Sequence, residues 1–544
     1  MDRELIKKIL SALPSLFFII VVVLPLASVF AVSFTEGGSI TLEHYLAVYH
    51  LQTLALLLKS CVLAASVAII ATIIGALFGY VLSSTDLPFS SPLKLLFLLP
   101  LFVSPYYLAV AMHDFVFLLL GNTRMLNSEE AVAAILIMSY APIPFLIMSA
   151  SFANINSRME EAGLLVASKM RTAWSIIFPL VKPAFVSSFV LVFILAVAEI
   201  TVPSYYLVNL FPTELFMQFT AFYNHKTAIA LGSAICLISN VLLLMERSFL
   251  TNAPFLAIGK KGSTKRTATL GNWKYPVLVV AVSYLVFVVI IPLVGLSMQA
   301  FRESMPDYLR DKSMPAGYLP LENELGYSMN YLYKGFALLK PVILDSLLYA
   351  LLGSLLICIL GFVFAYRSER KKIKWMDYLL LLVFAIPSTI FGIALIKFYN
   401  RASLEFIYTS AFIILIGYIG KFTFVASRMI GNSIRQVPYS LEEAAELTGA
   451  KSLTRFWYIL FPLVLEGFFA AFIVCFIFCL GEMATTIVIY PPGNSLLPIK
   501  IATSMHNTPD GLISAMVFII LLLTFSLLGI LYGIKKYFIK RTIL

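Results

Sequence analysis

EEAGLLVASKMRTAWSIIFPLV, residues 160–181, returns 283 residues later as EAAELTGAKSLTRFWYILFPLV, residues 443–464. Ten of the 22 aligned positions are identical, where an average composition gives about one or two by chance. The same offset places Glu199 on Glu482. The chain therefore contains an internal repeat, and a repeat decides the architecture before any single element does.

The composition indicates an integral membrane protein. Of 544 residues, 60% are hydrophobic and 12% are charged, and the mean hydropathy is +0.94. A soluble chain carries about 25% charged residues, so the excess apolar surface has to face lipid. The five cysteines lie in apolar runs, without the C-x-x-C and histidine spacing of a zinc site. We therefore expect no disulfide framework, no metal site and no cofactor.

Twelve apolar stretches reach the roughly 20 residues that a bilayer span needs. They are residues 9–33, 54–84, 93–119, 131–153, 183–209, 226–246, 275–299, 341–367, 378–400, 410–430, 465–490 and 510–534. The predicted fold is an all-α membrane protein with six spans in each half. Because six is even, both halves have the same orientation and the repeat is parallel. The predicted domains are a first permease repeat, 1–247, a cytoplasmic linker, 248–274, and a second permease repeat, 275–544.

The basic residues predict the orientation of the chain. With the N-terminus inside, 27 of the 39 lysines and arginines fall on the cytoplasmic side. Cytoplasmic loops of membrane proteins carry an excess of basic residues, so both termini are expected in the cytoplasm. The net charge of +11 is then a topology signal spread over short loops, and no nucleic acid is expected as a partner.

The repeated segment lies between the fourth and fifth spans of each half and is longer than an ordinary connection. Bundle loops usually have 2–8 residues, yet about 30 residues lie here in both halves. Each copy begins with acidic residues, which suit a helix N-terminus. Gly449 suits a left-handed turn between two short helices, and Pro179 and Pro462 mark the start of the next span. We expect two projecting loops that form a pseudo-twofold pair, suited to a twofold partner.

The second copy resembles a known family. The run Glu443-Ala444-Ala445, followed by Gly449, Ile459 and Pro462, is similar to the EAA loop of binding-protein-dependent ABC importer permeases, the MetI-like group. The resemblance extends over both halves. It implies that each loop is a coupling helix that sits in a groove of a cytoplasmic ATPase.

The first copy departs from this pattern, because it reads Glu160-Glu161-Ala162 and has Val166 where the family has glycine. The alternative is that Glu160 and Glu443 are only favourable helix-start residues. A merely solvated loop has no reason to match its twin at ten positions, which favours coupling. The ATPase-coupling residues implied by the resemblance are Glu160, Glu161, Ala162, Ala167, Pro179, Glu443, Ala444, Ala445, Gly449 and Pro462.

The chain has no phosphate-binding loop of its own. No G-x-x-x-x-G-K-[ST] pattern occurs, and Gly259-Lys260 lacks the preceding glycine and follows no strand. ATP hydrolysis is therefore expected in trans, from two copies of a cytoplasmic ABC ATPase, and this chain is not expected to be an enzyme.

One glutamate lies late in the fifth span of each half. Ionisable residues within a membrane span are functional candidates by default. Glu199 and Glu482 could attract a cationic substrate or hold an outer gate shut, or they could be structural carboxylates bonded to neighbouring helices. The run Gly481-Glu482, with Tyr490-Pro491-Pro492-Gly493, resembles the external loop of two-domain permeases for ferric iron and their thiamine and aminoethylphosphonate relatives. The predicted pathway or gate residues are Glu199, Glu482, Pro491, Pro492 and Gly493.

The sequence thus predicts a fused ABC importer permease in a prokaryotic inner membrane, supplied by an extracytoplasmic substrate-binding protein. Ferric iron is the substrate that the resemblance suggests, and thiamine, aminoethylphosphonate, polyamines and oxyanions stay open. A secondary transporter of the major-facilitator kind also has six plus six parallel spans. The long segments after the fourth span of each half argue against it. A membrane-embedded enzyme ranks third, because no two candidate catalytic groups share a recognisable motif.

Overall fold

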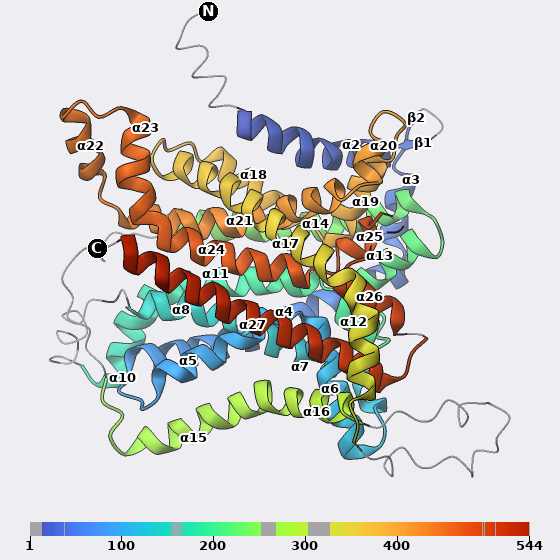
Figure 1. Ribbon diagram of the computed structural model, residues 1–544, viewed down its shortest axis with the longest axis horizontal. Helices are drawn as coiled ribbons and strands as arrows, with labels where there is room; N and C mark the ends of the chain where they lie inside the picture. Colours follow the sequence, from blue (N-terminus) through green and yellow to red (C-terminus); the bar gives the residue numbers. More distant parts are fainter. Residues whose placement is uncertain are drawn as a thin grey trace, which may run out of the picture. The chain divides into compact units, whose positions relative to one another are not determined.

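The computed structural model describes residues 13–36, 39–153, 155, 163, 165, 167–251, 268–302, 327–491, 493, 495–505 and 507–542. Helices dominate the described residues, as Figure 1 shows. The strands β1 (Thr35–Glu36) and β2 (Ser39–Ile40) form one short antiparallel hairpin, in which Thr35 pairs with Ile40.

The described residues contain nine helices that are long and apolar enough to cross a membrane, and three bent helix pairs that pass the same test together. If each bent pair is one span, the total is twelve, and each overlaps one predicted span. The single helices are Leu13–Ser33, Leu51–Ser84, Trp174–Tyr205, His225–Glu246, Gly271–Ala300, Asn330–Glu369, Phe412–Gln436, Ser452–Gly481 and Asp510–Leu531. The prediction of an all-α membrane fold is confirmed.

The chain folds into two compact units that do not coincide with its two halves. Unit 1 comprises Met1–His44, His225–Ile229 and Ala300–Leu544, and unit 2 comprises Tyr45–Asn224 and Ala230–Gln299. The first span therefore groups with the helices of the second half, and the seventh span with those of the first half. The boundaries at 247 and 274 describe the sequence repeat, and that division stays a prediction.

Unit 2 is built around α4, which packs against α8 and α11. Gly75 of α4 lies so close to α8 that an added Cβ would meet the Pro144 Cβ at 2.5 Å. The helices of unit 2 are α4 (Leu51–Ser84), α5 (Ser90–Leu98), η3 (Leu99–Phe102), α6 (Pro105–Leu120), η4 (Arg124–Leu126), α7 (Glu129–Tyr140), α8 (Pro142–Ala153), α10 (Lys169–Thr172), η5 (Ala173–Ile177), α11 (Phe178–Val197), α12 (Thr201–Tyr205), α13 (Phe211–Thr220), α14 (His225–Thr251, which begins in unit 1), η7 (Gly271–Trp273), α15 (Lys274–Leu285), η8 (Val286–Ile290) and α16 (Ile291–Ala300).

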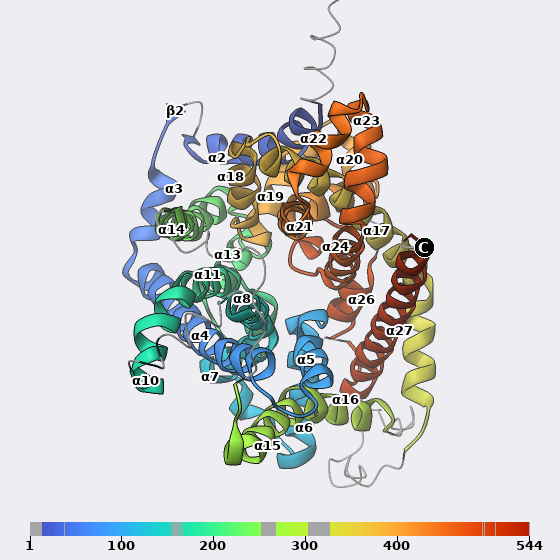
Figure 2. The ribbon, with the colours of Figure 1, turned by 90° about the vertical axis from the view of Figure 1, so that its left-hand side faces the viewer.

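Unit 1 is built around α17, which packs against α21 and α24, with α27 alongside it (Figure 2). An added Cβ at Gly361 of α17 would meet the Ala426 Cβ at 2.8 Å. The helices of unit 1 are η1 (Ile19–Val23), α2 (Leu24–Ser33), α17 (Asn330–Glu369), α18 (Trp375–Phe384), α19 (Ser388–Tyr399), α20 (Glu405–Tyr408), α21 (Phe412–Gln436), α22 (Tyr439–Leu447), α23 (Ser452–Arg455), η12 (Phe456–Leu460), α24 (Phe461–Gly481), α25 (Thr486–Ile489), α26 (Leu497–Ser504) and α27 (Asp510–Thr542). The short helices α3 (Glu43–Leu46) and η2 (Ala47–Tyr49) lie where the chain passes from unit 1 to unit 2.

The two units repeat the same internal contacts. The Ser60 hydroxyl accepts a hydrogen bond from the Phe211 N–H at 2.9 Å, and Ser346 accepts one from Leu497 at the same distance. Both residues of the second pair lie 286 positions after those of the first, the offset that also relates Gly75 to Gly361. The repeat in the sequence is therefore a repeat of packing.

Prolines explain a recurring distortion of the spans. Each π-helical turn in the described chain is followed two residues later by a proline, and these are Pro25, Pro179, Pro292 and Pro462. Proline donates no backbone hydrogen bond, and its ring clashes with the carbonyl four residues earlier. That carbonyl lies within the wider π turn in each case, where the helix can absorb the clash.

Two predicted spans are sharply broken rather than straight. The segment Ser90–Phe102 meets α6 at 102°, and α18 meets α19 at 100°. The break comes at Ser104 in unit 2 and at Pro387 in unit 1, and ψ is 138° at both residues. A residue before proline is driven out of the helical region, which accounts for Ser104 before Pro105. The arms α6 and α19 are largely buried.

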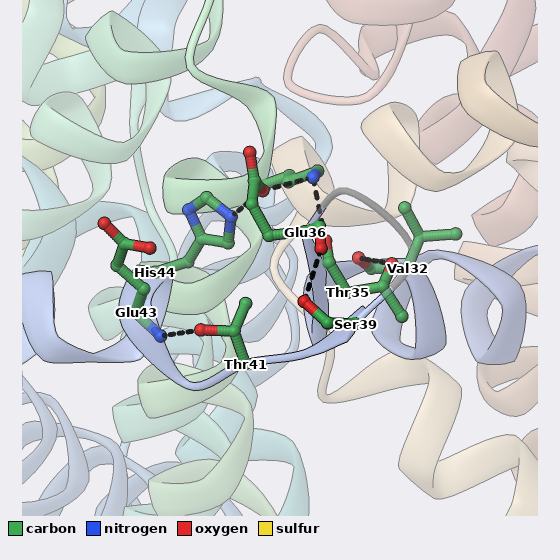
Figure 3. A network of polar contacts seen from close by, with 8 residues as sticks. Val32, Thr35, Glu36, Ser39, Thr41, Glu43 and His44 are labelled. Carbon is green, nitrogen blue, oxygen red and sulfur yellow. Dashed lines mark hydrogen bonds and ion pairs between the residues drawn. The ribbon is translucent and has the colours of Figure 1, made fainter.

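The hairpin after α2 is tied to the start of α14. Lys226 pairs with the Glu36 carboxylate and donates to the Thr35 carbonyl at 2.8 Å. Figure 3 shows the His44 ring turned toward the same carboxylate, and its Nε2 lies 2.7 Å from Glu36 Oε2. All these residues lie in unit 1.

Candidate coupling loops and pathway carboxylates

The second predicted coupling loop has a well-defined shape. The helices α22 and α23 extend past the ends of α21 and α24, which they join (Figure 1). Between them the chain turns at Gly449, whose φ of +83° lies in the left-handed region that favours glycine. Pro462 is the second residue of α24, but it lies within the continuous helix Ser452–Gly481, directly after the π turn η12. The prediction that Pro462 marks the start of the next span is therefore wrong, because the π turn lets the helix continue through the proline.

The outer side of this loop presents the predicted coupling residues to solvent. Glu443 and Ala444 are exposed, and Ala445 is half-buried. Large apolar side chains are exposed beside them, namely Tyr439, Leu441, Leu447, Leu453, Trp457 and Tyr458. Leu447 is 90% exposed. A group of exposed apolar side chains on a projecting loop is typical of a docking surface.

The inner side of the loop is held by ion pairs. Glu442 is buried, and its Oε1 lies 2.8 Å from Arg370 Nε, just past the end of α17. Arg455 pairs with Glu446 across the turn. The two consecutive glutamates of α22 therefore differ in their surroundings, because Glu442 faces an arginine inside the unit and Glu443 faces outward.

The first predicted coupling loop is described in part. Glu160, Glu161 and Ala162 lie outside the described residues. The half-buried Ala167 donates its N–H to the Gly163 carbonyl at 2.9 Å. Pro179 is the second residue of α11, the position that Pro462 has in α24.

Each predicted pathway glutamate follows the long helix of the fifth span of its half, Glu199 after α11 and Glu482 after α24. Glu199 follows α11, and its Oε1 accepts from the Thr201 N–H at 2.8 Å, at the first residue of α12. The Tyr140 hydroxyl donates to the other oxygen at 2.9 Å. Glu482 follows α24, is 8% exposed, and its Oε1 accepts from the Thr485 N–H at 2.8 Å, just before α25. Each carboxylate therefore accepts a hydrogen bond from a backbone N–H at or just before the start of the short helix that follows it.

The predicted external signature is only partly described. Pro491 is buried, Gly493 is exposed with a φ of +86°, and Pro492 lies outside the described residues. Among the described residues, no group of three or more His, Cys, Asp and Glu side chains could hold a metal ion.

Sequence reasoning missed two basic residues. Lys421, within the predicted span 410–430, donates to the Ile386 carbonyl at 2.8 Å, next to the break before α19. A lysine within an apolar span is itself a signal that could have singled it out. Arg370 looked like one more basic loop residue, and only its contact with Glu442 sets it apart.

Comparison with known proteins gives one family model and several relatives that bear on the class. Residues 357–543 match the family model described as the binding-protein-dependent transport system inner membrane component. The chain is 23% identical over 518 residues to the ferric transport system permease protein FbpB of Actinobacillus pleuropneumoniae, covering 88% of this chain and 70% of that one. It is 27% identical over 232 residues to the putative 2-aminoethylphosphonate transport system permease protein PhnV of Salmonella choleraesuis, covering 41% and 83%.

Together with the apolar spans, these matches define the class, and the chain is a multi-pass membrane permease. Residues 357–543 carry a domain of the binding-protein-dependent transport system inner membrane component family. The putative ferric transport system permease protein FbpB 1 of Haemophilus influenzae, 22% identical over 513 residues, covers 88% of this chain and 76% of its own.

Proposed function

We propose that this chain is the fused permease of an ATP-driven importer for ferric iron, which an extracytoplasmic binding protein delivers. The observation that carries the substrate is the extent of the likeness to ferric transport permeases, since the alignment with FbpB of Actinobacillus pleuropneumoniae runs over 88% of this chain. The aminoethylphosphonate relative matches over 41%, which makes phosphonate the second candidate.

Two copies of a cytoplasmic ABC ATPase would supply the energy, one for each coupling loop. This requires both termini and both loops on the cytoplasmic side, as the basic residues indicate. The exposed apolar side chains around α22 support docking there. Closure of the ATPase pair would move both loops together, and the permease would alternate between two rigid packings.

The experiment is reconstitution of the permease in proteoliposomes with its ATPase and binding protein. Radioactive ferric iron should enter only when ATP is present on the ATPase side. Gly449→Val should reduce uptake, because a β-branched residue is strained at a φ of +83°. Gly121→Val is the matched control, because Gly121 has a φ of +67° and, like Gly449, has open space where its Cβ would be.

Three outcomes would contradict this proposal. Uptake without ATP would indicate a secondary transporter. Failure of any ATPase to co-purify with the unaltered chain would remove the coupling role of the loops. ATP-driven uptake of 2-aminoethylphosphonate in place of iron would keep the class of transporter and replace the substrate.

A further inference from the structure

The start of the second coupling helix is held at three points by one arginine. Arg370 Nε lies 2.8 Å from Glu442 Oε1, and its Nη2 donates to the Val437 carbonyl at 2.9 Å. Its guanidinium carbon lies 5.5 Å from the centre of the Tyr439 ring. These contacts fix the turn before α22, its first residue and its first helical turn.

Glu369, the residue before Arg370, forms a second ion pair, in which the end of α17 supplies the acidic partner. Glu369, the last residue of α17, lies 2.7 Å from Arg435 near the end of α21. Two consecutive residues of opposite charge at the end of α17 therefore bond to the chain on both sides of the turn into α22. We call Glu369, Arg370, Arg435 and Glu442 the clamp.

Burial makes the Arg370–Glu442 pair more than a surface contact. The two side chains are 10% and 9% exposed, whereas exposed ion pairs contribute little. Removing one partner of a buried pair leaves an uncompensated charge, which strongly favours separation of the elements. The pair therefore ties the start of α22 to the end of α17.

The helix held by the clamp is central to unit 1. It runs for 40 residues, Asn330–Glu369, and packs along α21, α24 and α27. Interdigitated helices of this kind move as rigid bodies rather than deform continuously. The clamp therefore joins α22 to a helix that packs against α21, α24 and α27.

The first half has no such pair in its sequence. The offset of 286 that relates the packing of α4 and α17 places Ser83 and Ser84 on Glu369 and Arg370. The offset of 283 that relates the loops places Met159 on Glu442. The Ser84 carbonyl instead accepts from the Ala268 N–H at 2.8 Å, so the end of α4 is tied to the segment before α15.

We propose that Arg370 is a positioning residue that transmits the movement of the second coupling loop to α17. We infer that the two loops are unequal, because the aligned positions of the first half hold Ser84 and Met159 in place of Arg370 and Glu442. The inference rests on the proposed docking of an ATPase at the loops. It goes beyond that docking, because it states which helix receives the movement and in which half.

The test is charge reversal with rescue. Arg370→Glu and Glu442→Arg are made singly and together and are reconstituted with the ATPase and binding protein. Each single variant should keep the ATPase bound while iron uptake per ATP hydrolysed falls roughly tenfold. The double variant, which restores an ion pair with reversed charges, should recover uptake per ATP to within about threefold. Lys59→Glu is the matched control, because Lys59 forms an exposed pair with Glu129 at 2.8 Å, and it should leave the ratio unchanged.

The outcomes separate this inference from the proposed function. Loss of the ATPase from the unaltered chain contradicts the docking. An ATPase that stays bound while single variants transport normally per ATP overturns the clamp. If a single variant does not accumulate in the membrane, the double variant provides the test of the clamp. A double variant that accumulates but keeps a low iron uptake per ATP hydrolysed also overturns the clamp. A clamp that only stabilised the fold would lower the amount of protein and leave uptake per ATP unchanged.

Discussion

Lys421 shows how one residue can define a break in a span. It is half-buried in α21 and donates to the Ile386 carbonyl, which precedes Pro387 and the 100° turn into α19. A carbonyl beside a helix break has no partner within the helix, and in an apolar interior it needs one. The lysine supplies a charged donor, whose hydrogen bonds are the stronger kind.

Lys421→Met should therefore lower stability by about 2 kcal/mol, because it leaves a carbonyl without this charged donor. The measurement is the thermal midpoint of the purified permease in detergent. Lys397→Met is a suitable control, because that lysine lies in the last turn of α19 and not at its break. Equal midpoints for Lys421→Met and the unaltered chain would show that the break holds without the lysine.

The two glutamates allow their alternative roles to be separated. Glutamine keeps an oxygen that can accept from the Thr201 and Thr485 N–H groups, and leucine does not. The observed contacts favour the structural role, so Glu482→Gln should retain iron uptake, while Glu482→Leu should lose roughly 1 kcal/mol of stability. Uptake assays and unfolding curves on both variants, and on the same pair at Glu199, provide the measurement. Loss of uptake in a stable glutamine variant would instead support a charge acting in the pathway.

At the scale of elements, the hairpin after α2 is predicted to depend on pH. Two hydrogen bonds hold the pKa of the Glu36 carboxyl below its usual value of 4.5. The bond from Lys226 has the larger effect, and the bond from His44 has the smaller one. A lowered folded pKa means that the stabilisation is complete above about pH 4.5 and is lost as the pH falls through the lower folded value. The thermal midpoint of the unaltered chain should therefore fall more between about pH 5 and pH 3 than that of Glu36→Gln. Parallel pH profiles for the two proteins would count against this role of Glu36.

The same scale shows what the sequence could predict. Each of the nine long apolar helices and each of the three bent pairs overlaps a stretch that hydropathy predicted, because lipid imposes a length and an apolar composition on a span. The glycine turn at Gly449 follows from a backbone rule local to that residue. The same rules wrongly placed span starts at Pro179 and Pro462, because a π turn before each proline lets the helix continue through it. The 100° and 102° breaks do not follow, because proline occurs within bent and continuous helices alike. Pro183 lies inside α11, which stays one helix.

Pairings between distant residues also escaped prediction. The Arg370–Glu442 contact joins positions 72 apart in the numbering, and many other basic residues occupy similar loops. The repeat fixed which contacts should recur, such as those of Ser60 and Ser346, but Arg370 and Glu442 lie where the two copies differ. The sequence also could not predict which spans group into each unit, because an apolar span carries no charge or turn that specifies its neighbours.

At the scale of the whole molecule, each half of the chain supplies a span to the unit formed mainly by the other half. The helix α2 belongs to unit 1, where the Tyr399 hydroxyl donates to the Val21 carbonyl at 2.9 Å, just before α2 begins. The helix α16 belongs to unit 2, where an added Cβ at Gly295 would meet the Phe115 Cβ at 2.6 Å.

Two fragments, 1–251 and 268–544, should therefore co-purify through detergent extraction when they are expressed together. Gly295→Leu in the second fragment should weaken this association, because overpacking of such a contact costs about 1–3 kcal/mol. Gly529→Leu should not, because an added Cβ there meets open space. Fragments that purify separately, or that respond equally to both substitutions, would show that the exchanged spans do not join the two halves.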